Sequence, residues 1–185
     1  MNIVGKNIQL RAIEREDLPA LQKWANDPDI QLQLGGWHFP TSLKDQGEWY
    51  STLSCNSINQ RFAIEAKELG IIGTANLVSI DWKNRNAFHG MLIGDKDLRG
   101  KGYGFDVVMS IMRYAFDELG LVRLDTDIIE YNKLSLKLYV ERCGWVIEGR
   151  RPNWYFRQGR YWEKIIVGVT RERYEQFISA SRHSQ

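Results

Sequence analysis

The sequence predicts an α/β fold, of the α+β type, in which one mixed and mostly antiparallel sheet of about seven strands is flanked by helices. Two observations lead to this prediction. Strand-like segments in the middle of the chain are joined by short polar connections, which is typical of antiparallel neighbours. Segments with apolar residues at helical spacing lie before and after them. The chain has 185 residues and no composition break that would mark a linker, so we expect a single domain over residues 1–185.

The first third of the chain predicts one strand and two helices. Residues 8–12 alternate apolar and polar side chains, as a strand with one buried face does. Residues 14–27 begin with acidic side chains and continue with apolar residues at helical spacing, which predicts a helix. Residues 31–41 contain two glycines and a proline and predict a loop. Residues 42–53 predict the second helix, because their first residues resemble a capping box.

The rest of the chain predicts further strands and helices in alternation, a hairpin and a polar tail. The long helix has an apolar stripe that ends at Gly120, and Asn132 is a good N-cap for the helix after it. The predicted segments are strands over 61–66, 71–79, 87–93 and 121–129, helices over 103–119 and 132–143, two strands within 145–169 and a polar helix or tail over about 170–185.

Charge and composition exclude several classes of protein. Lys and Arg number 25 and Asp and Glu 23, a net charge of +2, whereas a dedicated nucleic-acid binder has a larger basic excess, so we expect no nucleic-acid partner. No apolar run approaches the roughly 20 residues that cross a bilayer, and the N-terminus lacks a secretory signal, so we expect a soluble, cytoplasmic protein without a membrane partner. The scattered cysteines and histidines predict no metal site; they are Cys55, Cys143, His38, His89 and His183.

A glycine-rich turn lies between a predicted strand and a predicted helix. Gly100, Gly102 and Gly104 alternate with other residues at the point where a helix leaves its first N–H groups without intrahelical partners. Those donors and the helix dipole attract an anion, and glycines let a phosphate approach the backbone. Arg99 and Lys101 add positive charge. The turn therefore predicts a phosphate site, although the same glycines are also compatible with a tight turn and nothing more.

Two common phosphate-binding motifs do not fit this turn. The dinucleotide pattern GxGxxG would need glycine where Phe105 stands. The P-loop pattern GxxxxGK[ST] would need glycine where Arg99 stands. A nucleotide-binding domain of another fold is therefore disfavoured.

The turn matches the R/Q-x-x-G-x-G/A signature of GNAT acetyltransferases, and nearly the whole chain resembles the branch that includes ribosomal-protein N-terminal acetyltransferases and spermidine acetyltransferases. The resemblance implies two strands, 87–93 and 123–129, that splay apart around acetyl-CoA, which is the co-substrate. Segments that support the resemblance are Ile8–Arg11, Ile93–Asp95, Tyr114–Leu121, Asn132–Ser135, Cys143–Trp145, Glu148–Arg150 and Gly159–Tyr161.

The resemblance also implies roles for single residues on the cofactor side. The main chain of Met91, Leu92 and Ile93 would pair with the pantetheine arm in the manner of strand addition. Asn132 would touch the arm, unless it serves as an N-cap alone. The residues implied to hold the pyrophosphate are Arg99, Gly100, Lys101, Gly102, Tyr103 and Gly104.

One tyrosine is implied to be the catalytic residue. Tyr139 stands where the family usually keeps a hydroxyl near the cofactor sulfur, and a phenol can protonate the departing thiolate. The helical spacing of its neighbours is equally compatible with a place in a buried stripe.

The general base and the acceptor site are less defined. Many relatives carry a glutamate where Phe88 stands, and the adjacent His89 would face the other way on an alternating strand. A water chain reaching a more distant side chain, or an amine that arrives neutral, are the open alternatives. The distant candidates are His38, Glu65, Asp125 and Asp127. The resemblance places the acceptor near Trp37, His38 and Phe39 and near the aromatic hairpin Trp154, Tyr155 and Phe156.

The sequence thus predicts an N-acetyltransferase that moves an acetyl group from acetyl-CoA to a primary amine by direct transfer through a ternary complex. The amine is a protein N-terminus or a small molecule. The alternative is a non-catalytic acyl-CoA sensor of the same fold, which the missing glutamate favours. We expect a monomer or a homodimer.

Overall fold

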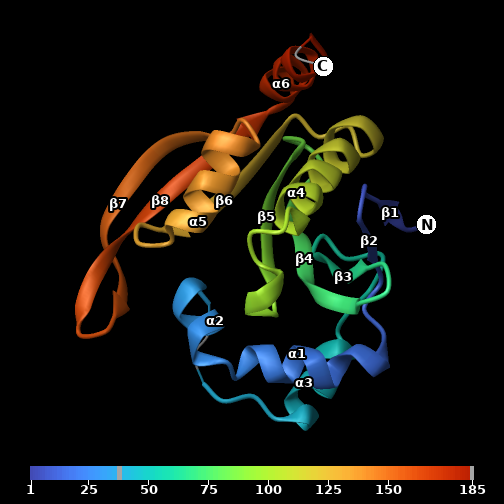
Figure 1. Ribbon diagram of the computed structural model, residues 1–185, viewed down its shortest axis with the longest axis vertical. Helices are drawn as coiled ribbons and strands as arrows, with labels where there is room; N and C mark the ends of the chain where they lie inside the picture. The colour runs from blue at the N-terminus through green and yellow to red at the C-terminus, as the bar shows by residue number, and fades with distance from the viewer. Residues whose placement is uncertain (37–38, 184–185) are drawn as a thin grey trace.

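The computed structural model describes residues 1–36 and 39–183, and these residues form one sheet flanked by helices (Figure 1). Its strands are β1 (Ile3–Val4), β2 (Ile8–Arg11), β3 (Gln60–Ala66), β4 (Gly70–Asp81), β5 (Asn86–Ile93), β6 (Arg123–Ile129), β7 (Val146–Arg157) and β8 (Arg160–Thr170). Its α-helices are α1 (Leu18–Ala25), α2 (Pro28–Gln33), α3 (Leu43–Tyr50), α4 (Tyr103–Arg113), α5 (Lys133–Leu136) and α6 (Arg171–His183). Shorter turns are η1 (Arg15–Asp17), η2 (Lys96–Leu98), η3 (Tyr114–Glu118) and η4 (Lys137–Arg142).

The sheet confirms the predicted mixed, mostly antiparallel architecture. The strand order is β1-β2-β3-β4-β5-β6-β8-β7, and only β5 and β6 run parallel among the described strands. The described sheet has eight strands instead of about seven because β1 adds two residues at one edge, too few to produce a periodic pattern in the sequence.

The parallel neighbours β5 and β6 separate after three residue pairs. Asn86–Phe88 pairs with Arg123–Asp125, and no pairing follows among the described residues beyond that point. From there β5 stays paired with β4 as far as Ile93, and β6 stays paired with β8 as far as Ile129. Each strand therefore keeps one partner and turns an unpaired edge toward the other, which confirms the predicted splay.

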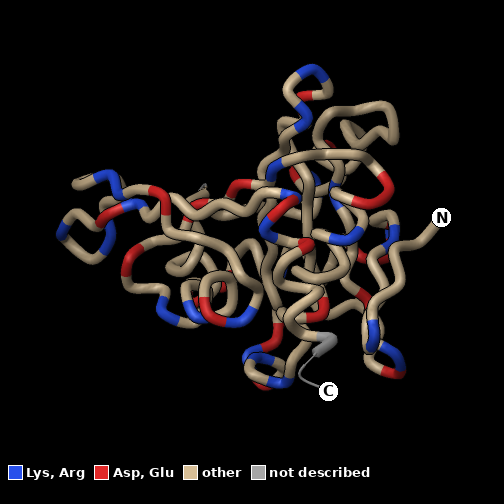
Figure 2. The backbone as a smooth tube through the Cα atoms, turned by 90° about the horizontal axis from the view of Figure 1, so that it is seen from above, with Lys and Arg blue, Asp and Glu red and all other residues tan. Residues whose placement is uncertain are grey.

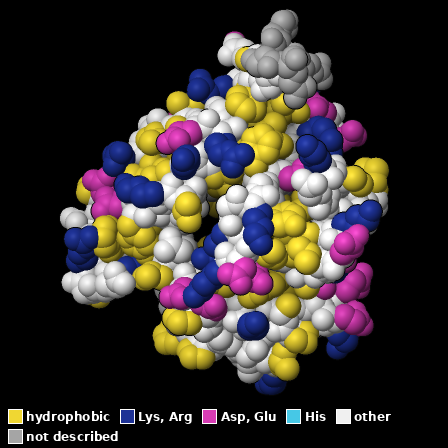
Figure 3. All heavy atoms as spheres, viewed as in Figure 1, with side chains coloured by type: hydrophobic (Ala, Val, Ile, Leu, Met, Phe, Trp, Pro, Cys, Tyr) yellow, Lys and Arg dark blue, Asp and Glu magenta, His cyan; other side chains and the backbone are white. Residues whose placement is uncertain are grey.

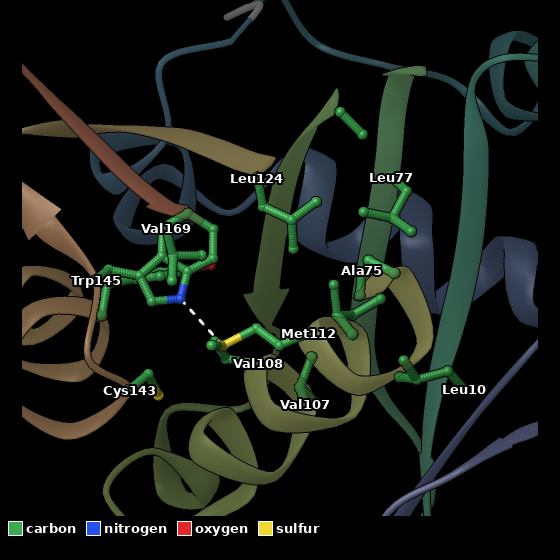
Figure 4. Close-up of a cluster of buried hydrophobic side chains, with 14 of the residues drawn as sticks. Leu10, Ala75, Leu77, Val107, Val108, Met112, Leu124, Cys143, Trp145 and Val169 are labelled. Atoms are coloured by element: carbon green, nitrogen blue, oxygen red, sulfur yellow. Dashed lines mark hydrogen bonds between the residues drawn. The ribbon is translucent and has the colours of Figure 1, made fainter. Parts of the chain in front are cut away.

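One face of the sheet is covered by α4 and the helical segment α5–η4. The core on this side is fully buried, and Figure 4 shows the Trp145 ring beside α4, where its indole Nε1–H donates to Met112 Sδ at 3.2 Å. Leu77 on β4 and Leu124 on β6 project into the same cluster. These contacts fix α4 relative to the two strands that separate.

The opposite face is covered by α1, α2 and α3. A second, smaller core holds them there through Leu21, Trp24, Ile30 and Ala63, with Leu92 of β5 packed against it. Figure 1 shows α1 and α3 side by side beneath one end of the sheet, in agreement with their mutual contacts. The capping box predicted at the start of α3 is confirmed, since Ser42 and Asp45 bond reciprocally.

The helix α2 is absent from the sequence prediction, which was wrong for residues 31–33. Asp27 caps this helix, accepting from the Asp29 N–H at 2.8 Å, and Pro28 is its first residue. The prediction gave more weight to the glycines at 35 and 36 than to this start signal. The loop prediction holds for the described residues after Gln33, whereas Trp37 and His38 lie outside the described residues.

The helix predicted over 103–119 forms as α4 followed by the π-helical turn η3. Gly120 follows with φ +66°, the left-handed conformation that glycine adopts after a helix. The polar helix predicted for the last segment forms as α6. In the part of the chain that is described, no helix is long and apolar enough to cross a membrane.

Charge is distributed over the chain without a dominant sign. Figure 2 shows basic and acidic residues interleaved along most of the backbone, with several basic residues near the end of the β7–β8 hairpin. Over the ranges 1–36 and 39–183, no group of three or more His, Cys, Asp or Glu side chains is placed to hold a metal ion.

Candidate active site

The glycine-rich turn leaves open space in front of the α4 N-terminus. Gly100 and Gly102 have φ of +77° and +92°, and a Cβ at either position would meet no atom within 4 Å. Gly104 differs, because a Cβ there would lie 3.1 Å from Met91 Cε and 3.2 Å from Leu138 Cδ2. The first two glycines therefore shape an open turn, and the third allows α4 to pack closely against β5.

The first N–H groups of α4 have no partner in the described structure. The first bond of the helix runs from Asp106 N to Gly102 O at 3.1 Å, and no side chain caps the helix. The N–H groups of Tyr103, Gly104 and Phe105 are therefore open donors, with Lys101 exposed beside them. This end of α4 can bind an anion.

The acidic residue in the first turn of α4 is used elsewhere. Asp106 is buried, and its carboxylate accepts from the Lys6 N–H at 2.8 Å and the Asn7 N–H at 2.6 Å. These bonds attach the turn between β1 and β2 to α4. The carboxylate is thus directed toward that turn, and the open donors keep a positive local field.

The open edge of β5 carries the three residues predicted to contact the pantetheine arm. Met91, Leu92 and Ile93 pair with β4 on one side, and their other edge faces the splay. The Met91 side chain lies on the α4 face against Gly104, whereas Leu92 lies on the face of α1 and α3. The structure thus brings this strand edge and the glycine-rich turn together.

Tyr139 lies in η4, next to the splay. Its side chain is 4% exposed, and its ring packs edge-on against Trp145 at 5.0 Å and beside the His89 ring at 5.9 Å between centroids. Its hydroxyl has no hydrogen-bond partner among the described residues, yet it is not among the fully enclosed polar atoms. Burial raises the pKa of the phenol, so the hydroxyl keeps its proton at neutral pH. Tyr139 therefore belongs to the buried stripe of its helix, and its hydroxyl can still donate a hydrogen bond to a bound molecule.

His89 faces the α4 side of the sheet, as the strand alternation predicted. Its Nδ1 lies 2.8 Å from the Asn76 carbonyl oxygen, so Nδ1 carries the proton and donates it. Its Nε2 is buried without a partner in the described structure. Burial lowers the pKa of His89 to about 4. The imidazole is therefore neutral at physiological pH and stands behind the strand, away from Phe88.

Acidification is expected to destabilise the protein through His89. The unfolded imidazole has a pKa near 6.5, so between that value and the folded value of about 4 the unfolded state binds the extra proton. The contribution is fully present above pH 6.5 and declines by about 2 to 3 kcal/mol toward pH 4.5. Urea unfolding at both ends of this range should show a smaller loss for His89→Asn, whose amide can keep the bond to Asn76. An equal loss in both proteins contradicts the assignment.

The distant carboxylates considered as general bases are held in ion pairs. Glu65 pairs with Arg11 at 3.2 Å, Asp125 pairs with Arg123, and Asp127 pairs with Lys164 at 2.5 Å. The structure brings none of the three to the cavity described next. A base that acts through water, or an amine that arrives neutral, stays open.

A cleft of about 370 Å³ lies on the opposite face of the sheet from α4, and we call it the acceptor cleft after the role that is proposed for it below. It is formed by α1, α2, α3 and the adjacent strands, and its Leu92 belongs to the open part of β5. Its lining residues are Ile13, Leu21, Trp24, Ala25, Gln31, Thr41, Asp45, Gln46, Trp49, Arg61, Thr74, Ala75, Asn76 and Leu92. Such a volume suits a small organic molecule.

Several of these residues escaped the sequence prediction. No role was predicted for Trp24, Trp49, Arg61 or Asn76. For Arg61 and Asn76 the sequence gives one weak signal. Each is a polar residue within a predicted strand, and residues two positions apart in a strand share a face of the sheet. Their proximity depends on the β3–β4 register, which pairs Arg61 with Asn76.

The residues predicted for the acceptor are only partly placed. Phe39 is 65% exposed and lines a second hollow of about 290 Å³ together with Arg157, while Trp37 and His38 lie outside the described residues. In the hairpin Trp154 and Phe156 are exposed, and Tyr155 is buried, where a Cβ on Gly35 would meet its hydroxyl. None of the described members lines the acceptor cleft.

The helix α2 is attached to both sides of the splay. Asp29 forms an ion pair with Lys96, which follows β5. On the other side the Tyr131 hydroxyl donates to Leu32 O, and Asn132 Nδ2 donates to Gln33 O at 3.3 Å. Asn132 Oδ1 also accepts from the Ser135 N–H, which confirms its interpretation as an N-cap.

The surface is hollowed at the splay. Figure 3 shows a recess between the part formed by α5 and the hairpin and the part formed by α4 and β5, with Lys and Arg side chains on its border. An anion-binding helix end, an unpaired strand edge and a phenol thus surround one opening in the sheet, and an organic cleft lies on the other face. This arrangement suits transfer of a group from a phosphate-containing donor.

The comparisons with known proteins define the class. A family model described as acetyltransferase (GNAT) domain matches residues 7–146, and the chain belongs to this family. It is an acetyl-CoA-dependent N-acetyltransferase, with acetyl-CoA as co-substrate, and it acts on amines.

Individual relatives fall in the predicted branch. The chain is 29% identical to the SPbeta prophage-derived uncharacterized N-acetyltransferase YokL of Bacillus subtilis, over 92% of this chain and 94% of that protein. It is 24% identical to the putative ribosomal N-acetyltransferase YdaF of the same organism, over 93% and 96%. A crystal structure of spermidine N-acetyltransferase from Vibrio cholerae with CoA and spermine superposes with a TM-score of 0.83, at 26% identity, over 91% of this chain and 98% of that one.

Proposed function

We propose that this enzyme transfers acetyl from acetyl-CoA directly to a primary amine, with both substrates bound at once across the splay. We propose also that residues 1–185 form one domain with this activity, since a single sheet includes residues from Ile3 to Thr170. The observation that carries the proposal is the opening between β5 and β6, which has open helix donors on one face and the acceptor cleft on the other.

On the donor side, the pyrophosphate binds the glycine-rich turn. Its oxygens accept from the open N–H groups of Tyr103, Gly104 and Phe105, and Arg99 and Lys101 supply charge. The pantetheine arm runs along the unpaired edge of Met91, Leu92 and Ile93 as an added strand. Asn132 orders the neighbouring loop, since both ends of its amide already have partners in the protein.

At the reacting centre, the neutral amine attacks the thioester carbonyl. The new C–N bond forms and the C–S bond breaks; the amine nitrogen releases one proton to water, the thiolate takes one from Tyr139, and the phenolate regains a proton through water, so that the products are the amide and the CoA thiol. Cys143 does not intervene as a nucleophile, because burial raises the pKa of its thiol to about 12. This favours direct transfer over an acetyl-enzyme intermediate.

The acceptor is proposed to be a small molecule in preference to a protein N-terminus. The support is the size of the acceptor cleft, about 370 Å³, and the likeness to an enzyme solved with spermine. Cytoplasmic location and a monomeric or homodimeric state stay predictions.

A CoA-release assay over a broad amine panel tests the proposed function. We expect a free thiol to appear only when acetyl-CoA and a suitable amine are both present, with initial rates that require both substrates before CoA leaves. Release of CoA before the amine is added would contradict direct transfer. Binding of acetyl-CoA in calorimetry without turnover of any amine would favour the sensor alternative.

A further inference from the structure

Two hydrogen-bond donors stand side by side on the wall of the acceptor cleft. Arg61 on β3 pairs in register with Asn76 on β4, and both line the cleft. Directly opposed residues of antiparallel strands point to the same face with Cβ atoms roughly 5 Å apart. The guanidinium of Arg61 and the amide of Asn76 therefore lie at the same part of the cleft wall.

Neither donor is engaged by an acceptor in the part of the protein that is described. Asn76 uses its Oδ1 to accept from the Gly90 N–H at 2.9 Å, which leaves its Nδ2 group without an acceptor. Arg61 has no carboxylate partner among residues 1–36 and 39–183, and its guanidinium carbon lies 5.9 Å from the centroid of the Trp49 ring. Partial burial lowers the pKa of Arg61, but the group stays charged.

The acceptor cleft is poorly suited to a polyamine. Among the residues that the structure describes, the charged ones in its lining are Arg61 and Asp45. The Asp45 carboxylate belongs to the capping box of α3, where Oδ2 accepts from the Ser42 N–H at 2.8 Å and the Ser42 hydroxyl at 2.6 Å. A polyamine carries several positive charges that need carboxylates, whereas the described lining of this cleft offers one carboxylate and adds a cation of its own.

We propose that the acceptor is a small amine that also carries a carboxylate, and that Arg61 and Asn76 bind this carboxylate. The inference rests on the proposed function, and it specifies the substrate class. A guanidinium presents paired N–H groups that match a carboxylate, and Asn76 Nδ2 adds a third donor beside them. Trp49 and Trp24 offer flat apolar surfaces to the body of such a molecule.

The register of the strands puts Arg61 and Asn76 near the splay. Asn76 pairs with Gly90, which lies just beyond the last pair between β5 and β6 at Phe88. Two strand spacings put the Arg61 and Gly90 backbones roughly 10 Å apart, and both residues belong to the face of the sheet that the cleft covers. A carboxylate on Arg61 can therefore belong to a molecule whose amine, a few ångströms away, reaches the thioester.

Matched pairs of amines test the inference by CoA release. The pairs are phenylalanine with phenethylamine, 4-aminobutyrate with propylamine, and 6-aminohexanoate with pentylamine, so that each pair differs by one carboxylate. Spermidine and an amidated tripeptide complete the panel. We expect at least one amino-carboxylate to have kcat/KM roughly 10- to 100-fold above its partner and above spermidine, as one charge-assisted contact provides.

Variants separate binding of the carboxylate from general damage. Arg61→Gln should remove the preference within the pair while leaving the Kd of acetyl-CoA unchanged, and Arg61→Glu should shift the preference toward spermidine. Arg15→Gln is the matched control, because Arg15 also stacks on an aromatic ring, Tyr50 at 5.9 Å, but does not line the cleft.

Three results overturn the inference. They are equal or better turnover of the amines without carboxylate, turnover of the tripeptide alone, and an unchanged preference in a folded Arg61→Gln protein. If no amine releases CoA, the proposed function itself fails and the inference with it.

Discussion

Aspartate in place of Gly102 is expected to weaken acetyl-CoA binding by about 100-fold or more. A carboxylate at the N-terminus of α4 would stand where the pyrophosphate accepts from open N–H groups, and each lost charge-assisted bond costs about 1.5 to 3 kcal/mol. The fold should persist, because a Cβ at Gly102 meets no atom within 4 Å. Calorimetric titration with acetyl-CoA measures the change.

Asparagine at the same position is the matched control. Gly102 has φ +92°, so any side chain there is strained, and Asn and Asp share this cost as residues that tolerate left-handed backbone. The two variants differ essentially by one negative charge. Equal affinities of Gly102→Asp and Gly102→Asn for acetyl-CoA would exclude the pyrophosphate from this turn.

Phenylalanine in place of Tyr139 is expected to lower kcat by about 100-fold or more and to change acetyl-CoA affinity little. The ring contacts with Trp145 and His89 remain, and only the donor to the thiolate is lost. Steady-state kinetics with one fixed amine, together with the Kd of acetyl-CoA, measures both effects.

The control for this prediction is Tyr174→Phe, which removes the hydroxyl of another buried tyrosine, one that donates to Asp117 in η3, beyond the end of α4 that is remote from the glycine-rich turn. It should leave turnover close to the wild-type value. If Tyr139→Phe turns over as fast as this control, Tyr139 has no part in proton transfer.

Local patterns predicted most of the strands and helices, because burial on one face imposes a period on the sequence. The helix from Tyr103 and the strands β3, β4 and β5 were predicted in this way, and their bounds differ by one or two residues at most ends. The two-residue β1 and the short α2 produce no period. The separation of β5 from β6 was predicted from the resemblance alone. Nothing in the sequence of either strand indicates where its pairing with the other strand ends.

The sequence indicated the proposed donor site and gave no sign of the proposed acceptor site. The turn from Arg99 to Gly104 would act through backbone groups that are neighbours in the sequence, so a short motif indicates it. The acceptor cleft joins Trp49, Arg61 and Asn76, which become neighbours only through strand register and helix packing. Such proximity is a property of the whole sheet.

The splay leaves an opening through a sheet that otherwise separates the two faces of the protein. In the arrangement proposed above, the donor approaches from the α4 side and the acceptor from the side of α1 and α3, and they meet through the gap between β5 and β6. Because the two sides share few side chains, substitutions on α1, α3 and the start of β3 can retune which amine enters without disturbing how CoA is held. Enzymes with this fold can thus change their acceptor specificity while the way they bind CoA stays the same.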